Sequence, residues 1–428
     1  MNGKRFGLWR ITLAALALVS IVAAQELPRA KPADVGLSAE RLERIMTTLK
    51  EDTSKNVVPG AVLLVARHGK VAWFEAAGVL DPATKAPMTR DAIFRVYSMS
   101  KPITTVSAMI LFEQGKIALQ DPLAKYIPDF APGKLKVGAE KKDSATGKTT
   151  LELEPLRRPI MIQDLMRHTS GLTYGIFGNS LVKRAYNEAG VLNGDYTNEE
   201  FAARIAKLPL QFQPGTVWEY SHATDILGRV VEVASGMSLY EFEKKNVLDP
   251  LAMNETGFYV TDKAKQSRIS EPFPQDRTIG VGTQIGDPRV EGKWQSGGGG
   301  MVSTTMDYAR FLQMMLNKGS LNGKRILSPT TVEFMTTDHL GDSIQHDGPS
   351  FFAGPGYSFG LGFAVRVKEG LAPDNGSVGD YTWNGVAGTN FWVDPKQDMF
   401  VVFMITSPRA RTHYMTVIRN MVYAAIEK

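Results

Sequence analysis

The sequence predicts a mixed α/β fold of the α+β type, with one antiparallel sheet built from both chain ends and flanked by helices. Two observations predict it. Apolar, strand-like runs occur in residues 60–79 and again in residues 357–406, each beside a helical pattern. Between them, residues 121–285 contain many short helical patterns broken by proline and glycine, and few clear strands. Strands from both ends can share one sheet around such an inserted helical domain.

We therefore expect three parts in the 428-residue chain. Residues 1–24 form a signal peptide, residues 25–120 and 286–428 form a discontinuous α/β domain, and residues 121–285 form a mainly helical inserted domain. The signal peptide is indicated by early basic residues, a short apolar run and the small residues "VAA" before Gln25. That run is short for a membrane span, and an uncleaved anchor is the alternative. We expect a periplasmic or secreted protein without membrane contact after cleavage.

Composition excludes several classes of protein. The formal net charge is +5, but three basic residues and no acidic residue lie in the signal segment, so the remainder carries +2. That small charge gives no reason to expect a nucleic acid partner. The chain contains no cysteine, which excludes disulfides and thiol catalysis. Nothing in the composition sets an oligomeric state.

The first half of the α/β part begins with a helix and a hairpin. "LSAERLERIMTTLKED" predicts a helix capped by Ser38, and "GAVLLVARHGKVAWFEAAGV" predicts a hairpin around the turn "HGK". Residues 104–114 predict an amphipathic helix directly after "VYSMSKPI". Within the insert, residues 141–159 predict a small hairpin with its turn near Gly147.

The second half of the α/β part starts at a glycine loop, residues 297–300. A helix follows, and Thr304 and Asp307 suit a capping box at its start. Three strands and a final helix are then predicted at residues 357–367, 380–394, 398–406 and 411–428.

Ser98 and Lys101 stand three residues apart at a helix start, so they share one face. A serine hydroxyl needs an adjacent base to become a nucleophile. A lysine can be that base when burial, positive neighbours or a helix N-terminus lower its pKa. The S-x-x-K spacing alone is weak, because Ser180 and Lys183 share it.

Histidines give no support for a metal site. No pair has metal-ligand spacing on one helix and there is no H-E-x-x-H, so we expect neither a metal nor a cofactor. A Ser-His-Asp triad stays open because triads are spatial, although no motif supports one.

Three stretches in order point to a family. They are Ser98-Met-Ser-Lys101, Tyr220-Ser-His222 and Trp383-Asn-Gly385. In this order they resemble the S-x-x-K, Y-x-N and K-T-G elements of serine β-lactamases and penicillin-binding proteins. The sequence is most similar to class C β-lactamases and the related family VIII carboxylesterases, over roughly residues 35–427 and including "DLMRHTSGLTYG". The resemblance implies a β-lactamase/transpeptidase-like fold, in agreement with the sheet and insert predicted above.

The resemblance also implies a role for each matching residue. Ser98 is the nucleophile, with Lys101 or Tyr220 as the base; the choice stays open because the two titrations are coupled. The oxyanion hole is formed by the amides of Ser98 and Val386. The expected substrate-binding residues are Trp383, Asn384, Gly385 and His222, with a glycine giving substrate a close approach to the strand.

Two departures from the family pattern bear on the substrate. Trp383 replaces the lysine of K-T-G, and an indole cannot pair with the carboxylate of a β-lactam. His222 replaces the asparagine of Y-x-N, and a charge on it would compete with Lys101. Both changes favour an uncharged ester, and W-x-G is the form that family VIII esterases commonly show.

The sequence thus predicts a serine carboxylesterase that hydrolyses short- to medium-chain esters through a Ser98 acyl-enzyme, with a small-molecule ester as its partner. The alternatives are a class C-type β-lactamase, a D-amino-acid peptidase or an acyltransferase on the same scaffold. A non-catalytic penicillin-binding-like protein would keep the fold without turnover. The complete set of Ser98, Lys101 and Tyr220 argues against that last alternative.

Overall fold

A central antiparallel sheet joins the two ends of the chain. The computed structural model describes residues 26–428 except 193, 280–282 and 349, so the predicted signal peptide lies outside the described residues. The sheet has eight strands in the order β12-β13-β14-β15-β16-β1-β2-β3. They are β1 (Gly60–Arg67), β2 (Lys70–Asp81), β3 (Ala86–Pro87), β12 (Tyr357–Phe359), β13 (Ala364–Arg366), β14 (Tyr381–Asn384), β15 (Asn390–Asp394) and β16 (Met399–Ile405). β1 pairs with β16, which confirms the sheet predicted from both chain ends.

The prediction of three strands in residues 357–406 is wrong, because the structure contains five there. The first two predicted strands are each a hairpin. β12 turns into β13 at residues 360–363, where the Gly360 amide donates to the Phe363 carbonyl, and β14 turns into β15 at residues 385–389. These turns are made largely of glycine and apolar residues. A buried turn of that composition has no polar signal that separates it from a continuous strand.

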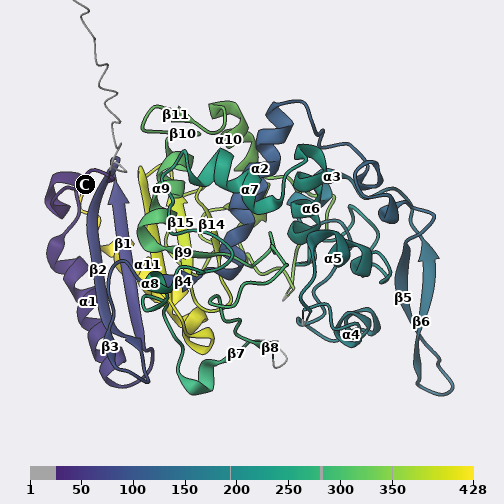
Figure 1. Ribbon diagram of the computed structural model, residues 1–428, viewed down its shortest axis with the longest axis horizontal. Helices are drawn as coiled ribbons and strands as arrows, with labels where there is room; N and C mark the ends of the chain where they lie inside the picture. Colours follow the sequence, from purple (N-terminus) through teal and green to yellow (C-terminus); the bar gives the residue numbers. More distant parts are fainter. Residues whose placement is uncertain (1–25, 193, 280–282, 349) are drawn as a thin grey trace, which may run out of the picture.

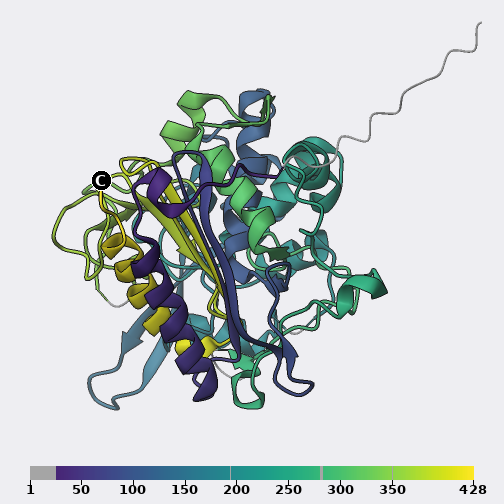
Figure 2. The same ribbon diagram turned by 90° about the vertical axis from the view of Figure 1, so that its left-hand side faces the viewer.

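Helices cover both faces of the sheet. Helices α1 (Ala39–Ser54) and α11 (Arg411–Ala424) lie side by side on one face (Figure 2), and Ser38 caps α1 as predicted. Helices α2 (Ser100–Glu113) and α9 (Thr305–Leu316) belong to the other side. Alternate residues of β1 therefore enter two different apolar clusters, and every residue of β1 is buried.

The remaining elements lie mostly in residues 121–285, beside the sheet (Figure 1). The helices are α3 (Ile162–Met166), α4 (Leu181–Glu188), α5 (Asn198–Ile205), α6 (Ala223–Ser235), α7 (Leu239–Glu243), α8 (Lys263–Gln266) and, later in the chain, α10 (Pro329–Met335). The two-stranded pairs are β5 (Lys136–Lys142) with β6 (Thr149–Pro155), β4 (Ile93–Arg95) with β9 (Val302–Thr304), β7 (Thr278–Ile279) with β8 (Thr283–Gln284), and β10 (Ser320–Leu321) with β11 (Lys324–Arg325). The division into domains stays a prediction.

Two local predictions are refined by the structure. The hairpin expected near Gly147 is β5–β6, and its turn contains Gly147 with φ of 70°. At α9, Thr304 caps the helix by accepting from the Asp307 amide. The Asp307 carboxylate instead accepts from the Glu255 amide at 2.7 Å, so the capping box is only half formed.

Candidate active site

Lys101 and Tyr220, predicted from two separate motifs, both reach the hydroxyl of Ser98. Ser98 lies in the short 3-10 turn Tyr97–Met99 that leads into α2. Its Oγ accepts hydrogen bonds from Tyr220 Oη at 2.6 Å and from Lys101 Nζ at 3.1 Å. Tyr97 has φ of 44°, in the left-handed region that a non-glycine residue rarely adopts, so the turn that presents Ser98 is strained. The serine hydroxyl therefore faces two groups able to take its proton.

Lys101 is buried, and three oxygens surround its amine. Besides Ser98 Oγ, Lys101 Nζ donates to Tyr174 Oη at 3.0 Å and to the Gly298 carbonyl at 2.6 Å. The nitrogen also lies 4.5 Å from the ring centroid of Tyr220. Lys101 is thus held rigidly by groups from four separate parts of the chain.

Tyr174 is a site residue that sequence reasoning did not assign. It belongs to "DLMRHTSGLTYG", which the resemblance includes, but no spacing connects it to Ser98. Burial raises the pKa of Tyr174 well above its ordinary value, with smaller contributions from the neighbouring Tyr220 and Asp225. Tyr174 is therefore a neutral phenol beside Lys101.

Tyr220 lies just before α6 among aromatic rings. Trp383 Nε1 donates to Tyr220 Oη at 3.3 Å, and the His168 ring lies 5.0 Å away by centroid. Burial and, second, the charge of Lys101 lower the pKa of His168 well below its ordinary value, so this histidine is neutral. The packing leaves Tyr220 one orientation, with its hydroxyl directed at Ser98.

Asp225 holds the glycine loop against Lys101. It accepts from Ser296 Oγ at 2.5 Å and from the Gly298 amide at 3.0 Å. Burial alone would raise the pKa of Asp225, but the hydrogen bond and charge of His222, with further contributions from Ser296 and Lys101, hold it below its ordinary value. Asp225 is therefore ionised, and it was not predicted as a site residue.

His222 lies beside Asp225 and away from Ser98 Oγ. Its Nδ1 is 2.8 Å from Asp225 Oδ2, and its ring lies 4.2 Å from that of Tyr174 by centroid. Its Nε2 has no hydrogen-bond partner among the described residues. Because an ionised carboxylate only accepts, His222 donates from Nδ1 to Asp225. The substrate contact predicted for His222 stays a prediction.

The third motif lies behind Tyr220 and against the segment that precedes Ser98. Trp383 and Asn384 line a separate cavity of about 60 Å³, and Trp383 reaches Ser98 only through Tyr220. A Cβ on Gly385 would collide with the Val96 carbonyl, so this glycine lets β14 approach the segment before Ser98. The substrate contacts predicted for Trp383, Asn384 and Gly385 stay predictions.

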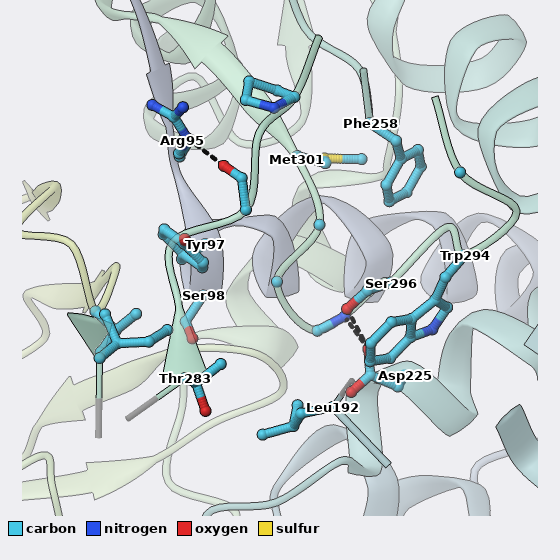
Figure 3. Close-up of a pocket in the computed structure, with 18 of the residues that line it drawn as sticks. Arg95, Tyr97, Ser98, Leu192, Asp225, Phe258, Thr283, Trp294, Ser296 and Met301 are labelled. Carbon is cyan, nitrogen blue, oxygen red and sulfur yellow. Dashed lines mark hydrogen bonds between the residues drawn. The ribbon is translucent and has the colours of Figure 1, made fainter. Parts of the chain in front are cut away.

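Ser98 opens into a cavity of about 620 Å³, which Val386 also lines (Figure 3). Its wall is mainly aromatic and apolar, formed by Tyr174, Phe177, Phe258, Tyr259, Trp294 and Met301. Figure 3 shows Ser98 on one side of the cavity. Asp225 and Ser296, which are hydrogen-bonded to each other, lie on the other side. The size and lining suit a small organic molecule.

Within the described ranges, no group of three His, Cys, Asp or Glu side chains is placed as metal ligands would be. Over the same residues, no helix is long and apolar enough to cross a membrane.

The fold and this site define a serine hydrolase, because a serine at a helix start meets a buried lysine and a tyrosine at the end of an apolar cavity. A model of the Beta-lactamase family matches residues 42–420. The chain belongs to the Beta-lactamase family.

Individual relatives agree with this assignment. Protein Rv1367c of Mycobacterium tuberculosis is 35% identical over 85% of this chain and 90% of its own length. Esterase EstB of Burkholderia gladioli is 29% identical over 93% of this chain and 98% of its own. The structure of "EstCE1, a hydrolase with promiscuous acyltransferase activity" superposes with a TM-score of 0.75 and 28% identity, covering 90% of this chain and 98% of that one.

Proposed function

We propose that this protein is a carboxylesterase that hydrolyses short- to medium-chain esters through an acyl-enzyme on Ser98. The observation that carries the proposal is the pair of hydrogen bonds to Ser98 Oγ, from Tyr220 at 2.6 Å and from Lys101 at 3.1 Å, at the wall of an apolar cavity. The similarity to esterase EstB supports the choice of an ester substrate.

The proposed reaction has two steps. Ser98 Oγ attacks the ester carbonyl while its proton passes to the Tyr220–Lys101 pair, and the negative charge gathers on the former carbonyl oxygen. The amides of Ser98 and Val386 stabilise that oxyanion. The intermediate collapses, the C–O bond to the alcohol breaks, and the alcohol leaves with the stored proton. Water then attacks the acyl-enzyme by the same route, which releases the acid and restores Ser98.

The surroundings of Ser98 favour an uncharged ester over a β-lactam. The position of the family's K-T-G lysine holds Trp383, whose only polar hydrogen is directed at Tyr220 Oη. No cation is therefore supplied there for a drug carboxylate. The large apolar wall suits acyl and alcohol groups of several carbons.

A second candidate activity is acyl transfer to an alcohol in place of water. The structural neighbour EstCE1 is described as having promiscuous acyltransferase activity. The cavity beside Ser98 is large and apolar enough to hold an alcohol as the second nucleophile. Acyl transfer would appear as a new ester when an alcohol such as butanol is added.

We also propose an exported protein, periplasmic or secreted, because residues 1–24 have the pattern of a signal peptide. Fractionation of cells that express the full chain tests this, together with N-terminal sequencing of the product. A mature N-terminus near Gln25 supports export, and an intact Met1 in the cytoplasmic fraction contradicts it.

The test of function compares p-nitrophenyl butyrate with a chromogenic cephalosporin, using the wild type and Ser98→Ala. Ester turnover that vanishes in the variant, with little lactam turnover, supports the esterase. Lactam turnover exceeding ester turnover favours the β-lactamase, and turnover of D-alanyl peptides alone favours the peptidase. Ester turnover retained in Ser98→Ala would contradict the assignment of Ser98 as the nucleophile.

A further inference from the structure

Glu243 is a buried carboxyl group behind the site that the proposed reaction leaves unused. It is the last residue of α7, and it is fully buried. Its Oε1 lies 3.0 Å from Thr104 Oγ1 on α2, and its Oε2 has no hydrogen-bond partner among the described residues. Burial, with a smaller contribution from the charge of Glu232, raises the pKa of Glu243 to about 8 despite the opposing Thr104 hydrogen bond. The group is therefore mainly protonated at neutral pH.

The two contacts of Thr104 can both be hydrogen bonds at once only if Glu243 carries a proton. Thr104 Oγ1 lies 3.0 Å from Glu243 Oε1 and also 3.0 Å from the carbonyl oxygen of Gly297. A hydroxyl has one proton to donate, and the Gly297 carbonyl can only accept. When Thr104 donates to Gly297, its other contact is a hydrogen bond only if Glu243 is the donor. Only the carboxylic acid form of Glu243 has that O–H.

Gly297 connects this chain of bonds to Lys101. The next residue is Gly298, whose carbonyl accepts from Lys101 Nζ at 2.6 Å. The loop fits closely at this point, because a Cβ on Gly297 would lie 2.9 Å from Thr104 Cγ2. A change in the bond between Thr104 and Gly297 is therefore transmitted to the carbonyl that holds the amine.

We propose that Glu243 is a positioning residue for Lys101. As a neutral acid it donates to Thr104, Thr104 donates to Gly297, and this relay holds the Gly298 carbonyl against the lysine. The inference rests on the proposed function, since it assumes that Lys101 takes part in ester hydrolysis. When Glu243 loses its proton, its carboxylate competes for the single proton of Thr104, and the Gly297 carbonyl loses its donor.

The proposed pH dependence depends on Glu243 and not on an ion-paired neighbour. Among the described residues, its one hydrogen-bond partner is Thr104. The charged side chains on the following turn and on the helices that pack most closely on α7 are Lys101, Glu113, Asp225, Arg229, Glu232, Lys244 and Lys245. Glu232 is bound by Arg229 at 3.1 Å, and Lys244 is paired with Asp249. None of these groups offers Glu243 an ion pair in the structure.

The test uses two matched pairs of variants in the full chain. Glu243→Gln keeps a neutral donor and cannot ionise, whereas Glu243→Leu removes the donor. Thr104→Ser keeps the hydroxyl, whereas Thr104→Val removes it. The kcat and KM for p-nitrophenyl butyrate are measured between about pH 6 and 10, after subtraction of spontaneous hydrolysis. Infrared spectra of wild type and Glu243→Gln report the carboxylic acid band directly.

In the wild type and in Thr104→Ser, kcat/KM should fall above a pH of about 8, where Glu243 loses its proton. Glu243→Gln should keep its rate at neutral pH and lack that alkaline decline. In Glu243→Leu and Thr104→Val, kcat should fall about tenfold with a smaller change in KM, because each variant lacks one positioning hydrogen bond. If Glu243 had only a structural role, the pH profile of Glu243→Gln would match that of the wild type.

Two results would overturn the inference. One is an alkaline decline in Glu243→Gln that matches the wild type. The other is the absence, near neutral pH, of a carboxylic acid band that disappears in Glu243→Gln. If the wild type hydrolyses no ester, the proposed function fails, while the infrared band still tests the proton on Glu243 independently.

Discussion

Replacing Gly385 by alanine tests whether the end of β14 must lie against the segment that carries Ser98. The added Cβ would lie closer than 3.0 Å to the Val96 carbonyl oxygen and to Thr389 Oγ1, a separation that real Cβ atoms essentially never show. Ordinary contact begins at 3.4 Å, so the strand end and the Val96 segment must separate by about 1 Å. Val386 would move with it.

The expected magnitude follows from that displacement. Overpacking of this kind costs about 1–3 kcal/mol of unfolding free energy, which leaves a typical domain folded. A shift of about 1 Å at an oxyanion donor costs on the order of 100-fold in rate. We therefore expect Gly385→Ala to fold and to lose far more kcat/KM for p-nitrophenyl butyrate than its stability loss can explain.

The matched control is Gly133→Ala. Gly133 is exposed, and a Cβ there meets nothing within 4 Å, so this variant should match the wild type in rate and in urea unfolding. The reasoning is refuted if Gly385→Ala unfolds earlier in urea yet keeps kcat/KM within about threefold of Gly133→Ala. Val386 would then have no part in stabilising the oxyanion.

Three further variants test other contacts. Tyr220→Phe removes the 2.6 Å hydrogen bond to Ser98 and should lower kcat by about 10²–10⁴ with little change in KM, measured by steady-state kinetics. Trp383→Phe removes only the 3.3 Å bond to Tyr220, so kcat/KM should fall about tenfold or less, and a larger loss would indicate direct substrate contact. Burial raises the pKa of Asp164, but hydrogen bonds and the charge of Arg158 outweigh it and hold that pKa below its ordinary value. The carboxylate therefore stabilises the fold above its ordinary pKa, and this contribution is lost as pH falls through the lowered value. Asp164→Asn should lower the unfolding free energy by about 2 kcal/mol at pH 7, a difference that shrinks toward pH 3 in urea titrations; a constant difference would contradict the assignment.

Much of the fold follows from local patterns in the sequence. The helix at α1, its Ser38 cap and the β1–β2 hairpin were predicted because periodicity and turn residues act over a few positions. The prediction was wrong where the turn chemistry was atypical. The hairpins β12–β13 and β14–β15 turn through glycine and apolar residues, so each resembled one long strand.

Some residues of the site were also predicted from the sequence, and others were not. Ser98 and Lys101 could be paired from spacing, since both stand at the start of one helix, and Tyr220 followed from the resemblance. Tyr174 was missed because it lies 73 positions from Lys101, and no local pattern links the two. Asp225 lies three positions from His222, but its bond to the Gly298 amide joins segments 73 positions apart. The bond from Trp383 to Tyr220 was not predicted, because it depends on packing between distant segments.

By itself, the sequence paired Ser98 with Lys101 and gave the order of motifs that indicates the family. These features depend on helix spacing and on residue chemistry, which are local. Only the tertiary structure decided which oxygens surround the amine of Lys101. It also placed an ionised Asp225 behind the glycine loop and left Gly385 to pack against protein. Those relations join distant segments, and close packing between segments sets them.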